Sequence, residues 1–476
     1  MTTIVVKDKH LSSKPIPGIN KLKPKVLLMA TVAATGGLLF GFDTGVISGA
    51  LPFLKEYWKL TDSNIELITT TVLVGAIIGA IVSGKLSDYL GRKMMIIINA
   101  VIFSIGAIGC TYASSIKMLI VMRILIGFAI GITSFVVPMY IAEVSPSRRR
   151  GALVTLNQLM ITIGILVSYV ADYWISDDNN LESWRWMFAV GFIPAVILLI
   201  GMLFLPETPR WLISKGRWEQ GKAVLETIED PDMIEETLQG LREEDALSKQ
   251  QKVSSKEILK PWLRYALVIT IGIFFFQQFS GVNTIIYYSP VIFHMAGIVS
   301  NTQSILPAII IGGMNVLACF VSVLLLDRVG RRKLYKIGMF GMIPSLALLG
   351  LCFYFKDALG ASLPYLAVLS IVLYIVFIAI SLAPLGWLLI SEVFPLSVRG
   401  VGMSIGSLAH WGFNAIIAFT FLKLVNGIGI ASTFWLYSII CIIGLIWGWY
   451  FIPETKGKSL EDIEKHWRNG GTPRSL

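Results

Sequence analysis

Long apolar segments alternate with short polar ones over nearly the whole chain. Because a helix rises about 1.5 Å per residue, about 20 apolar residues cross a hydrocarbon layer of roughly 30 Å. Twelve segments have this length, and they lie near 27–50, 66–86, 94–113, 118–141, 153–173, 187–205, 265–288, 303–326, 334–354, 364–390, 400–421 and 432–452. The pattern predicts an all-α membrane protein with twelve transmembrane helices.

The polar segments divide the chain into five regions. We predict an N-terminal leader over 1–25, a six-helix bundle over 26–210, a linker of short cytoplasmic helices over 211–262, a second six-helix bundle over 263–453 and a tail over 454–476. The first apolar run is too long for the apolar part of a signal peptide and lacks a small-x-small cleavage site. We therefore expect that run to be the first transmembrane helix.

Charged residues are few and unevenly placed. Hydrophobic residues make up 55% of the chain and charged residues 15%, whereas a soluble protein has about 25% charged residues. The net charge is +10, but with twelve spans nearly all Lys and Arg fall on the side of the N-terminus. The opposite loops hold only Lys55, Lys59, Lys117, Arg185, Lys356 and Lys423. This bias predicts a cell-membrane protein with both termini in the cytoplasm and speaks against nucleic-acid binding.

Three motifs occur twice, about 240 to 250 residues apart and in the same order. The pairs are Gly84-Lys-Leu-Ser-Asp88-Tyr-Leu-Gly91-Arg92-Lys93 with Leu326-Asp327-Arg-Val-Gly330-Arg331-Arg332-Lys333, Glu143-Val-Ser-Pro146 with Glu392-Val-Phe-Pro395, and Pro206-Glu207-Thr208 with Pro453-Glu454-Thr455. Both copies fall on the same predicted side of the membrane, so the repeat is parallel. A parallel repeat predicts a binding site between the two halves, near the middle of the membrane.

These motifs give the chain a resemblance to a known family. It resembles the sugar porter family of the major facilitator superfamily over almost its whole length, and within it the bacterial proton-coupled pentose and hexose symporters. The motifs are the repeated ones above together with Arg123-x-x-x-Gly127-x-x-x-Gly131, Pro138-Met-Tyr-Ile-Ala-Glu143, Pro206-Glu-Thr-Pro-Arg210-Trp211, Gln277-Gln278-Phe-Ser-Gly281-Val-Asn283 and Pro453-Glu-Thr-Lys456-Gly. The resemblance implies the major facilitator fold, with two six-helix bundles in a parallel repeat.

An aspartate, Asp43, lies near the middle of the first span. A charge at such a place costs about 2.5–3.5 kcal/mol on insertion scales, so it usually faces a cavity or a partner. Arg123 in the fourth span is the candidate partner. Pairing with an arginine favours release of the proton and separation favours its uptake, so the pair could carry a proton; the alternative is a static ion pair. The resemblance implies proton coupling, because the family's proton symporters have an aspartate at this position and the animal facilitators have no acidic residue there.

A sugar site needs amides that donate and accept hydrogen bonds, and an aromatic surface for the apolar face of the ring. The resemblance places binding roles on Gln158, Gln277, Gln278, Asn283, Asn315 and Trp387, and extends them to Phe40, Tyr287, Tyr288, Trp411 and Asn414. A helix break near Gly281 would let the adjacent glutamines converge. Each amide could instead only join helices, and each aromatic ring could only pack.

Three departures from the family pattern leave the sugar open. Ile165 stands where some xylose symporters have a second glutamine, the segment 379–384 lacks the glycines common before the family tryptophan, and His410 replaces an amide. His410 could titrate near neutral pH, or it could act as a hydrogen-bonding residue.

Charged residues at the predicted cytoplasmic ends of the spans are candidates for a gate. They are Asp88, Arg92, Glu143, Arg150, Glu207 and Arg210 in the first half, and Asp327, Arg331, Glu392, Arg399 and Glu454 in the second. We expect the two sets to face each other and to latch that end closed when they pair. The alternative is that these charges only set the topology.

The sequence thus predicts a proton-coupled symporter that imports a pentose or hexose by alternating access. An uncoupled facilitator of a sugar or of a polyol such as inositol is the alternative, and a non-transporting sugar sensor is a third interpretation, against which the short tail speaks. We expect no enzymatic activity and no cofactor or metal, because phosphate-binding loops and metal-ligand clusters are absent from the sequence. Cys110, Cys319, Cys352 and Cys441 lie in apolar spans, which indicates packing. The expected partners are a monosaccharide, a proton and the bilayer, with a monomer as the functional unit.

Overall fold

A computed structural model describes residues 23–146, 149–250, 255–395 and 398–476. Twelve helices or helix pairs in this part of the chain are long and apolar enough to span a membrane, which confirms the predicted fold class. The first six spans are α1 (Pro24–Tyr57), α2 (Asp62–Leu90), α3 (Arg92–Thr111), α4 (Ile116–Glu143), α5 (Arg150–Ile175) and the pair α6 (Ser183–Val190) and α7 (Phe192–Phe204).

The second six spans follow a linker of short helices. The linker holds α8 (Pro209–Ser214), α9 (Trp218–Ile228) and α10 (Ile234–Gln250), with 3-10 turns at Pro231–Met233, Ser255–Leu259 and Pro261–Leu263. The spans are the pair α11 (Arg264–Phe279) and α12 (Val282–Met295), then α13 (Asn301–Val329), α14 (Arg331–Tyr354), the pair α16 (Leu363–Ile380) and α17 (Leu382–Val393), α18 (Arg399–Ile428) and α19 (Ile430–Phe451). The short α15 (Lys356–Leu359), the 3-10 turn Gly360–Ser362 and the terminal α20 (Leu460–Arg468) complete the described helices.

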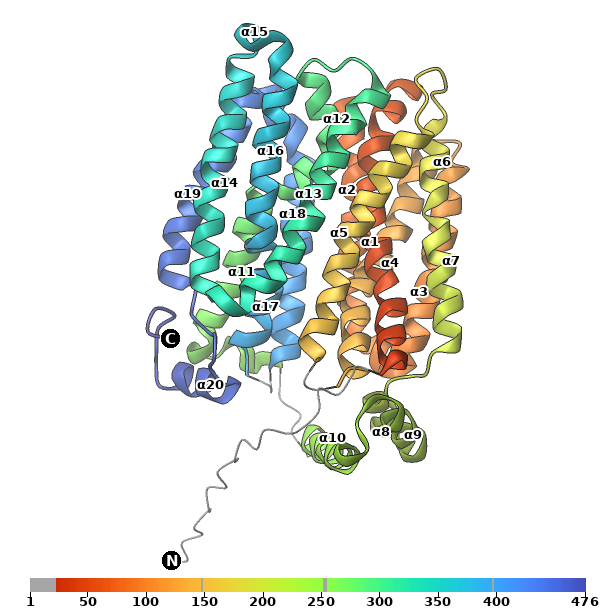
Figure 1. Cartoon of the computed structure of the whole chain (residues 1–476), viewed down its shortest axis with the longest axis vertical. Helices are drawn as coiled ribbons and strands as arrows, with labels where there is room; N and C mark the ends of the chain where they lie inside the picture. Colours follow the sequence, from red (N-terminus) through yellow and green to blue (C-terminus); the bar gives the residue numbers. More distant parts are fainter. Residues whose placement is uncertain (1–22, 147–148, 251–254, 396–397) are drawn as a thin grey trace, which may run out of the picture.

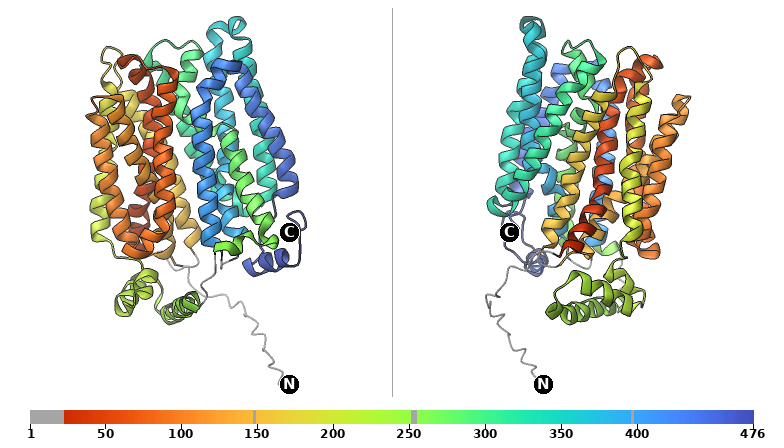
Figure 2. Two further views of the ribbon diagram at one scale, coloured as in Figure 1. Left: turned by 180° about the vertical axis from the view of Figure 1, so that it is seen from behind. Right: turned by 45° about the vertical axis from the view of Figure 1, so that its right-hand side comes forward.

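The spans form two groups of helices that stand side by side (Figure 1). The views from behind and from the side show α8–α10 below the first group and α20 below the second (Figure 2). We call the end of the molecule with α8–α10 the linker end and the opposite end the far end. Across the boundary between the groups, α2 packs against α18, α5 against α13 and α1 against α12.

Polar side chains define where several helices begin. Thr61 accepts a hydrogen bond from the Asn64 backbone at the start of α2, Ser115 caps α4 and Ser300 caps α13 in the same way. Such N-caps satisfy backbone N–H groups that have no partner inside the helix. These three helices therefore start where the apolar run meets a hydroxyl side chain, and all three starts lie at the far end.

Glycines allow α2 and α4 to approach closely. A Cβ at Gly75 would collide with the Ile124 carbonyl, and a Cβ at Gly127 would collide with the Val72 carbonyl. Small residues at such spacing let membrane helices pack backbone against backbone. Gly75 and Gly127 are therefore packing contacts in this structure, and they fix α4, which carries Arg123.

Candidate functional site

Asp43 and Arg123 form a buried ion pair between α1 and α4. Arg123 Nη1 donates to Asp43 Oδ1 at 2.7 Å, and the two side chains are 0% and 3% exposed. Arg123 lies over the Phe188 ring at 5.8 Å, and its Nε and Nη2 have no hydrogen-bond partner among the described residues. One hydrogen bond thus holds two charges in an apolar interior, where a missing partner is costly.

A narrow cavity joins this ion pair to the predicted sugar residues. Its lining includes Asp43 and Arg123 together with Phe40 of α1, Tyr287 of α12 and Trp411 of α18. The first three residues belong to one half and the last two to the other, so the cavity lies on the boundary. Its volume is about 10 Å³, which is room for about one water molecule. The structure therefore has the two halves closed around the ion pair.

A hydrogen-bond network connects the predicted amides of α11 and α12. Asn283 donates to Gln278 Oε1 at 2.7 Å, and Gln278 Nε2 lies 3.0 Å from His410 Nδ1. Gln277 Oε1 lies 3.3 Å from the same His410 nitrogen, and Gln277 Nε2 donates to the Leu382 carbonyl at 3.1 Å. His410 Nδ1 thus lies between the two glutamines, where one tautomer accepts from Gln278 and the other donates to Gln277. Gln277 links this group to the first turn of α17.

An aromatic chain runs beside this network. The Phe40 and Trp411 rings are 5.3 Å apart, Trp411 and His410 are 5.2 Å apart, and His410 and Trp387 are 5.2 Å apart. Asn414, one turn after Trp411, donates to the Tyr287 hydroxyl at 3.1 Å. The structure therefore brings together eight of the eleven predicted sugar residues, from both halves, around His410 and the cavity.

The other predicted sugar residues are less connected. Gln158 of α5 and Asn315 of α13 are half-buried, and neither makes a hydrogen bond to another described residue. Tyr288 instead donates to the Ala418 carbonyl at 2.9 Å and is fully buried. Its hydroxyl also lies beside Thr69 of α2, so Tyr288 packs at the boundary between the halves but outside the network around His410.

Two helix breaks place the site. The break that we expected near Gly281 is present: α11 ends at Phe279, Gly281 has φ 88°, and α12 begins at Val282. Only glycine adopts this left-handed conformation without strain. The tenth span breaks at Ser381, just before Pro384. Proline is tolerated there because the first turn of a helix needs no N–H donor. The break at Ser381 places the Leu382 carbonyl within reach of Gln277, and the break at Gly281 separates Gln277 and Gln278 of α11 from Asn283 of α12.

The sequence predicts His410 as a titratable or hydrogen-bonding residue but not as one of the sugar residues, and the structure places it in the middle of them. It is 9% exposed and touches both glutamines, Trp387 and Trp411. The available signal was a titratable side chain inside an apolar span, next to a candidate tryptophan. The contact between α18 and α11 at His410 depends on how the helices are arranged in space, which the sequence alone does not show.

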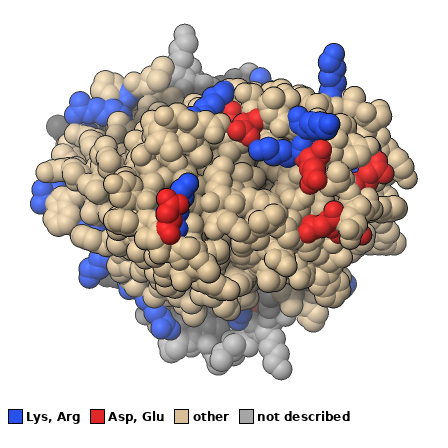
Figure 3. Space-filling model, turned by 90° about the horizontal axis from the view of Figure 1, so that it is seen from above, with Lys and Arg blue, Asp and Glu red and all other residues tan. Residues whose placement is uncertain are grey.

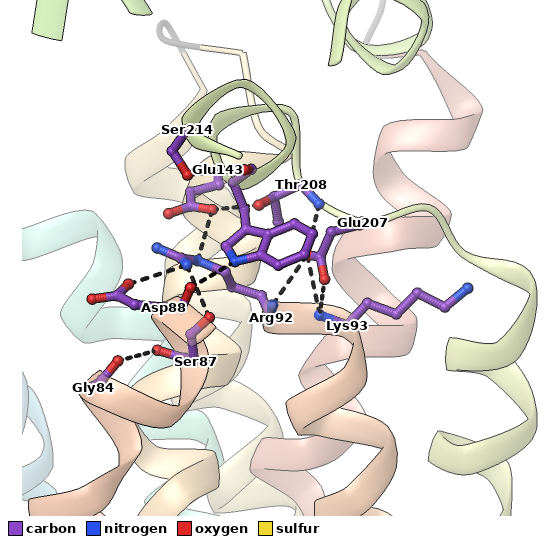
Figure 4. Close-up of polar contacts among 10 residues, drawn as sticks. Gly84, Ser87, Asp88, Arg92, Lys93, Glu143, Glu207, Thr208 and Ser214 are labelled. Atoms are coloured by element: carbon purple, nitrogen blue, oxygen red, sulfur yellow. Dashed lines mark hydrogen bonds and ion pairs between the residues drawn. The ribbon is translucent and has the colours of Figure 1, made fainter. Parts of the chain in front are cut away.

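At the linker end, the first copy of the repeated motif forms a closed cluster (Figure 4). Arg92 pairs with Asp88 at 3.2 Å and with Glu143 at 3.2 Å. Glu207 accepts hydrogen bonds from the backbone N–H groups of Arg92, at 3.1 Å, and Lys93, at 3.0 Å, and so caps α3. Burial raises the pKa of Glu207 above its ordinary value, although the surrounding backbone N–H groups act in the opposite direction.

The second copy repeats this geometry. Arg331 pairs with Glu392 at 2.7 Å, and Glu454 accepts from the backbone N–H groups of Arg331, at 3.0 Å, and Arg332, at 3.2 Å. Thr455 donates to Glu392 at 2.5 Å, as Thr208 donates to Glu143 at 2.6 Å. The sequence repeat is thus a repeat of one structural cluster.

These clusters correct one expectation. For Arg92 and Arg331, the pairing predicted between the two halves is replaced by pairing within each half. The reason is that each arginine meets the glutamate at the end of a span of its own half before it can reach the other half. Arg150 and Arg210 are exposed and Arg399 is half-buried, while the side chain of Asp327 lies outside the described residues.

The halves are joined by polar contacts at the far end, which sequence reasoning missed. Four carboxylates of the first half accept hydrogen bonds from the second half. Glu56 accepts from Asn301 (3.0 Å), Asp62 from Asn426 (3.0 Å), Glu66 from the Lys423 backbone (3.0 Å), and Asp178 from Ser300 (2.6 Å) and the Thr302 backbone (2.9 Å). Figure 3 looks onto this end, where charged side chains gather in a few patches on an otherwise uncharged face. The far end is thus closed by hydrogen bonds in this structure.

The chain is similar to known transporters over nearly its full length. The model of the family described as "Sugar (and other) transporter" matches residues 29–467. The chain belongs to this family. The predicted resemblance to the sugar porters is therefore confirmed, and a member of this family works as a transporter and not as an enzyme.

The chain is similar to individual members of the family with different named substrates. It is 36% identical over 458 residues to the galactose-proton symporter of Escherichia coli (strain K12), which covers 95% of this chain and 97% of that protein. It is 38% identical over 445 residues to the major myo-inositol transporter IolT of Bacillus subtilis (strain 168), covering 92% of this chain and 93% of that protein. The inward open structure of the xylose transporter XylE from E. coli matches with a TM-score of 0.80 and 31% identity, covering 93% of this chain and all of XylE.

Proposed function

We propose that this family member imports a pentose or hexose together with a proton across the cell membrane, by alternating access. The observation that carries the proposal is the shared cavity. It brings a buried Asp43–Arg123 pair into contact with Phe40, Tyr287 and Trp411 on the boundary between the halves. A protonatable carboxyl and a set of sugar-binding side chains thus form one site, which is what coupled transport needs.

Asp43 is the proposed proton carrier and Arg123 the group that controls it. With Arg123 at 2.7 Å, Asp43 is stable as an anion. When the arginine moves away, an isolated buried carboxylate is costly, so Asp43 takes up a proton. One charge moving through 100 mV is worth about 2.3 kcal/mol, which supports roughly a forty- to fifty-fold accumulation of sugar.

The sugar is proposed to bind between the halves when the cavity widens. The amides of Gln277, Gln278 and Asn283 would hydrogen-bond the hydroxyls, and Trp387 and Trp411 would cover the apolar ring faces. Gln158 of the first half and Asn315 of the second have no hydrogen-bond partner among the described residues and would complete the site. Phe40, Tyr287 and Asn414 would border it. A polyol is a second candidate substrate, because one relative is an inositol transporter.

The ends of the boundary are the proposed gates. The clusters at the linker end would make each half rigid and would close that end when the halves approach. They consist of Asp88, Arg92, Glu143 and Glu207 in one half and of Arg331, Glu392 and Glu454 in the other. Arg150, Arg210, Asp327 and Arg399 are proposed to take part. We propose that this end faces the cytoplasm, with the leader 1–25, the linker 211–262 and the tail 454–476 there, and that the two bundles 26–210 and 263–453 work as a monomer in the bilayer.

The test is uptake by liposomes that contain the purified protein. Labelled xylose, glucose, galactose and inositol are offered one at a time, with and without an inward proton gradient. We expect one of these sugars to accumulate above equilibrium and an uncoupler to abolish the accumulation. Equilibration that ignores the gradient would instead identify a facilitator, and accumulation of inositol alone would make the polyol the substrate.

A further inference from the structure

A second aspartate, Asp172 of α5, is buried in the spanning region without a partner. Its exposed fraction is 0%, and neither carboxyl oxygen accepts a hydrogen bond from any described residue. The side chain lies against α1, where it occupies the space that a Cβ at Gly49 would need. The Gly49 N–H lies close to the carboxyl, but inside α1 it donates to the backbone carbonyl four residues earlier in that helix. The neighbouring Ser48 hydroxyl is also buried and unpartnered within the described chain.

Helix α5 packs against α1, α4, α6 and α13. The groups on these helices toward the far end with partners of their own are Asp43 and Arg123, which pair with each other, Lys55, which pairs with Asp62, Glu56, which binds Asn301, Tyr57, which donates to Glu182, Arg185, which binds Glu182 and the Thr111 carbonyl, and Tyr169, which donates to the Ile286 carbonyl. Lys117 is exposed at the start of α4, and neither it nor Tyr173 of α5 donates to the carboxyl oxygens of Asp172. Lys25, Tyr140, Glu143 and Arg150 lie near the linker end of their helices. Arg328 of α13 lies at the linker end of that helix. No cation in the described part of the chain therefore balances a charge on Asp172.

An unpaired carboxylate in such a place is too costly to persist, so Asp172 carries a proton in this closed state. Its position links the proton to the boundary between the halves. Tyr169 lies one turn before Asp172 and donates across the boundary to the Ile286 carbonyl of α12 at 2.9 Å. Because α1 packs on α12 and α5 on α13, separating the halves at the far end opens a water path toward Asp172.

We propose that Asp172 is a second proton-binding carboxyl, which must be protonated before the far end can close. On closing, the carboxylate takes a proton from water on the far side and becomes a neutral acid; on reopening, it returns that proton to water. Low pH on the far side would then favour the closed end and high pH the open end. This inference rests on the proposed function only in treating the opening of the far end as a step of transport.

The experiment measures the opening of the far end directly, without substrate. The four native cysteines are replaced, and Lys117→Cys and Lys356→Cys place spin labels on exposed far-end positions of the two halves. The distance distribution is recorded by pulsed electron resonance between pH 5 and pH 9. One coupled proton changes the open-to-closed ratio by at most about tenfold per pH unit.

We expect the fraction of the unmodified protein with an open far end to grow as the pH rises. In Asp172→Asn the far end should stay closed, and the ratio of open to closed protein should change with pH as if one proton fewer were bound on closing. Asp172→Ala, also uncharged, should behave in the same way and keeps the test valid if the asparagine variant does not fold. The matched control is Asp177→Asn, an exposed aspartate two residues after the end of α5, which should leave the pH dependence unchanged.

An unchanged pH dependence in folded Asp172→Asn would overturn the proposal, and so would a parent protein that shows no pH dependence. Asp43→Asn separates the two carboxyls, because it should keep the part of the pH dependence that Asp172 causes. If the uptake assay found no proton coupling while this pH dependence persisted, the proposed function would fail and the role of Asp172 would stand.

Discussion

The ion pair between Asp43 and Arg123 rests on a single hydrogen bond, and two of the arginine nitrogens have no partner among the described residues. A pair built only for stability would use more of the arginine's donors, because each unsatisfied buried group costs free energy. A pair held by one hydrogen bond is what we expect if Asp43 is the proton carrier that we propose, because the carrier has to separate from Arg123.

Replacing Asp43 with asparagine removes the carboxyl group that would bind the proton and leaves the size of the side chain nearly unchanged. We expect Asp43→Asn to lose accumulation of sugar against a gradient, a loss of roughly forty- to fifty-fold at 100 mV, while exchange of labelled for unlabelled sugar continues. Asp357→Asn, at an exposed position of α15, is the matched control and should accumulate normally. Uphill uptake by Asp43→Asn would show that the proton binds elsewhere.

His410 orients the two glutamines, so its loss should weaken sugar binding without affecting coupling. Its ring nitrogen faces Gln278 Nε2 at 3.0 Å, and removing a buried partner costs about 1–3 kcal/mol. We predict that His410→Ala lowers sugar affinity by roughly five- to 150-fold, whereas His410→Asn recovers most of it through the amide. Binding calorimetry checks this, and equal affinity in the alanine variant and the parent would contradict it.

Much of the fold follows from the sequence because the signals are long. The twelve apolar runs are long enough to be identified as membrane spans even though their ends are uncertain by a few residues. The buried charge of Asp43 predicts a nearby cation, and Arg123 is the only Lys or Arg of the same half that lies away from the ends of the predicted spans. The sequence did not predict the hydrogen-bond network around His410, because the network depends on the direction that α12 and α17 take after the breaks at Gly281 and Ser381. The partners of Arg92 and Arg331 did not follow either, because many charges cluster at that end and only packing selects among them.

Among the helices, the contact between α2 and α4 is the tightest constraint on the position of Arg123. A Cβ at Gly127 would collide with the Val72 carbonyl, whereas nothing lies within 4 Å of a Cβ at Gly84 of α2. Gly127→Ala should therefore lower the free energy of unfolding by about 1–3 kcal/mol. Gly84→Ala is the control and should be neutral or slightly stabilising, because alanine favours helix. Thermal melts of the two variants measure the difference, and equal melting temperatures would refute the packing account.

The whole molecule is held together at the far end by carboxylates of one half and donors of the other. Burial acts to raise the pKa of Asp178, but hydrogen bonds from Ser300 and Thr302 outweigh it and hold the pKa below its ordinary value. A carboxyl with a lowered pKa stabilises the closed form above that pKa and loses its effect only as the pH falls through it. The Asp178 contact should therefore persist at neutral and mildly acidic pH.

Removing this contact should open the far end. We predict that Asp178→Ala increases the labelling rate of a cysteine placed in the far-end boundary by a few fold, since exposed hydrogen bonds to charged groups contribute about 1 kcal/mol. Asp177→Ala removes a neighbouring carboxylate without a contact to the other half and should leave the rate unchanged. Equal labelling of the two variants would mean that the Asp178 contact does not hold the halves together.

The central claim, that sugar and proton move together through Asp43, is tested most directly by proton movement that sugar drives. Liposomes with the protein and an internal pH dye receive a pulse of the transported sugar with no imposed proton gradient. We predict that the interior of liposomes with the parent protein acidifies as sugar enters, and that liposomes with Asp43→Asn take up sugar without acidification. Sugar entry by the parent protein without any change of internal pH would contradict the account.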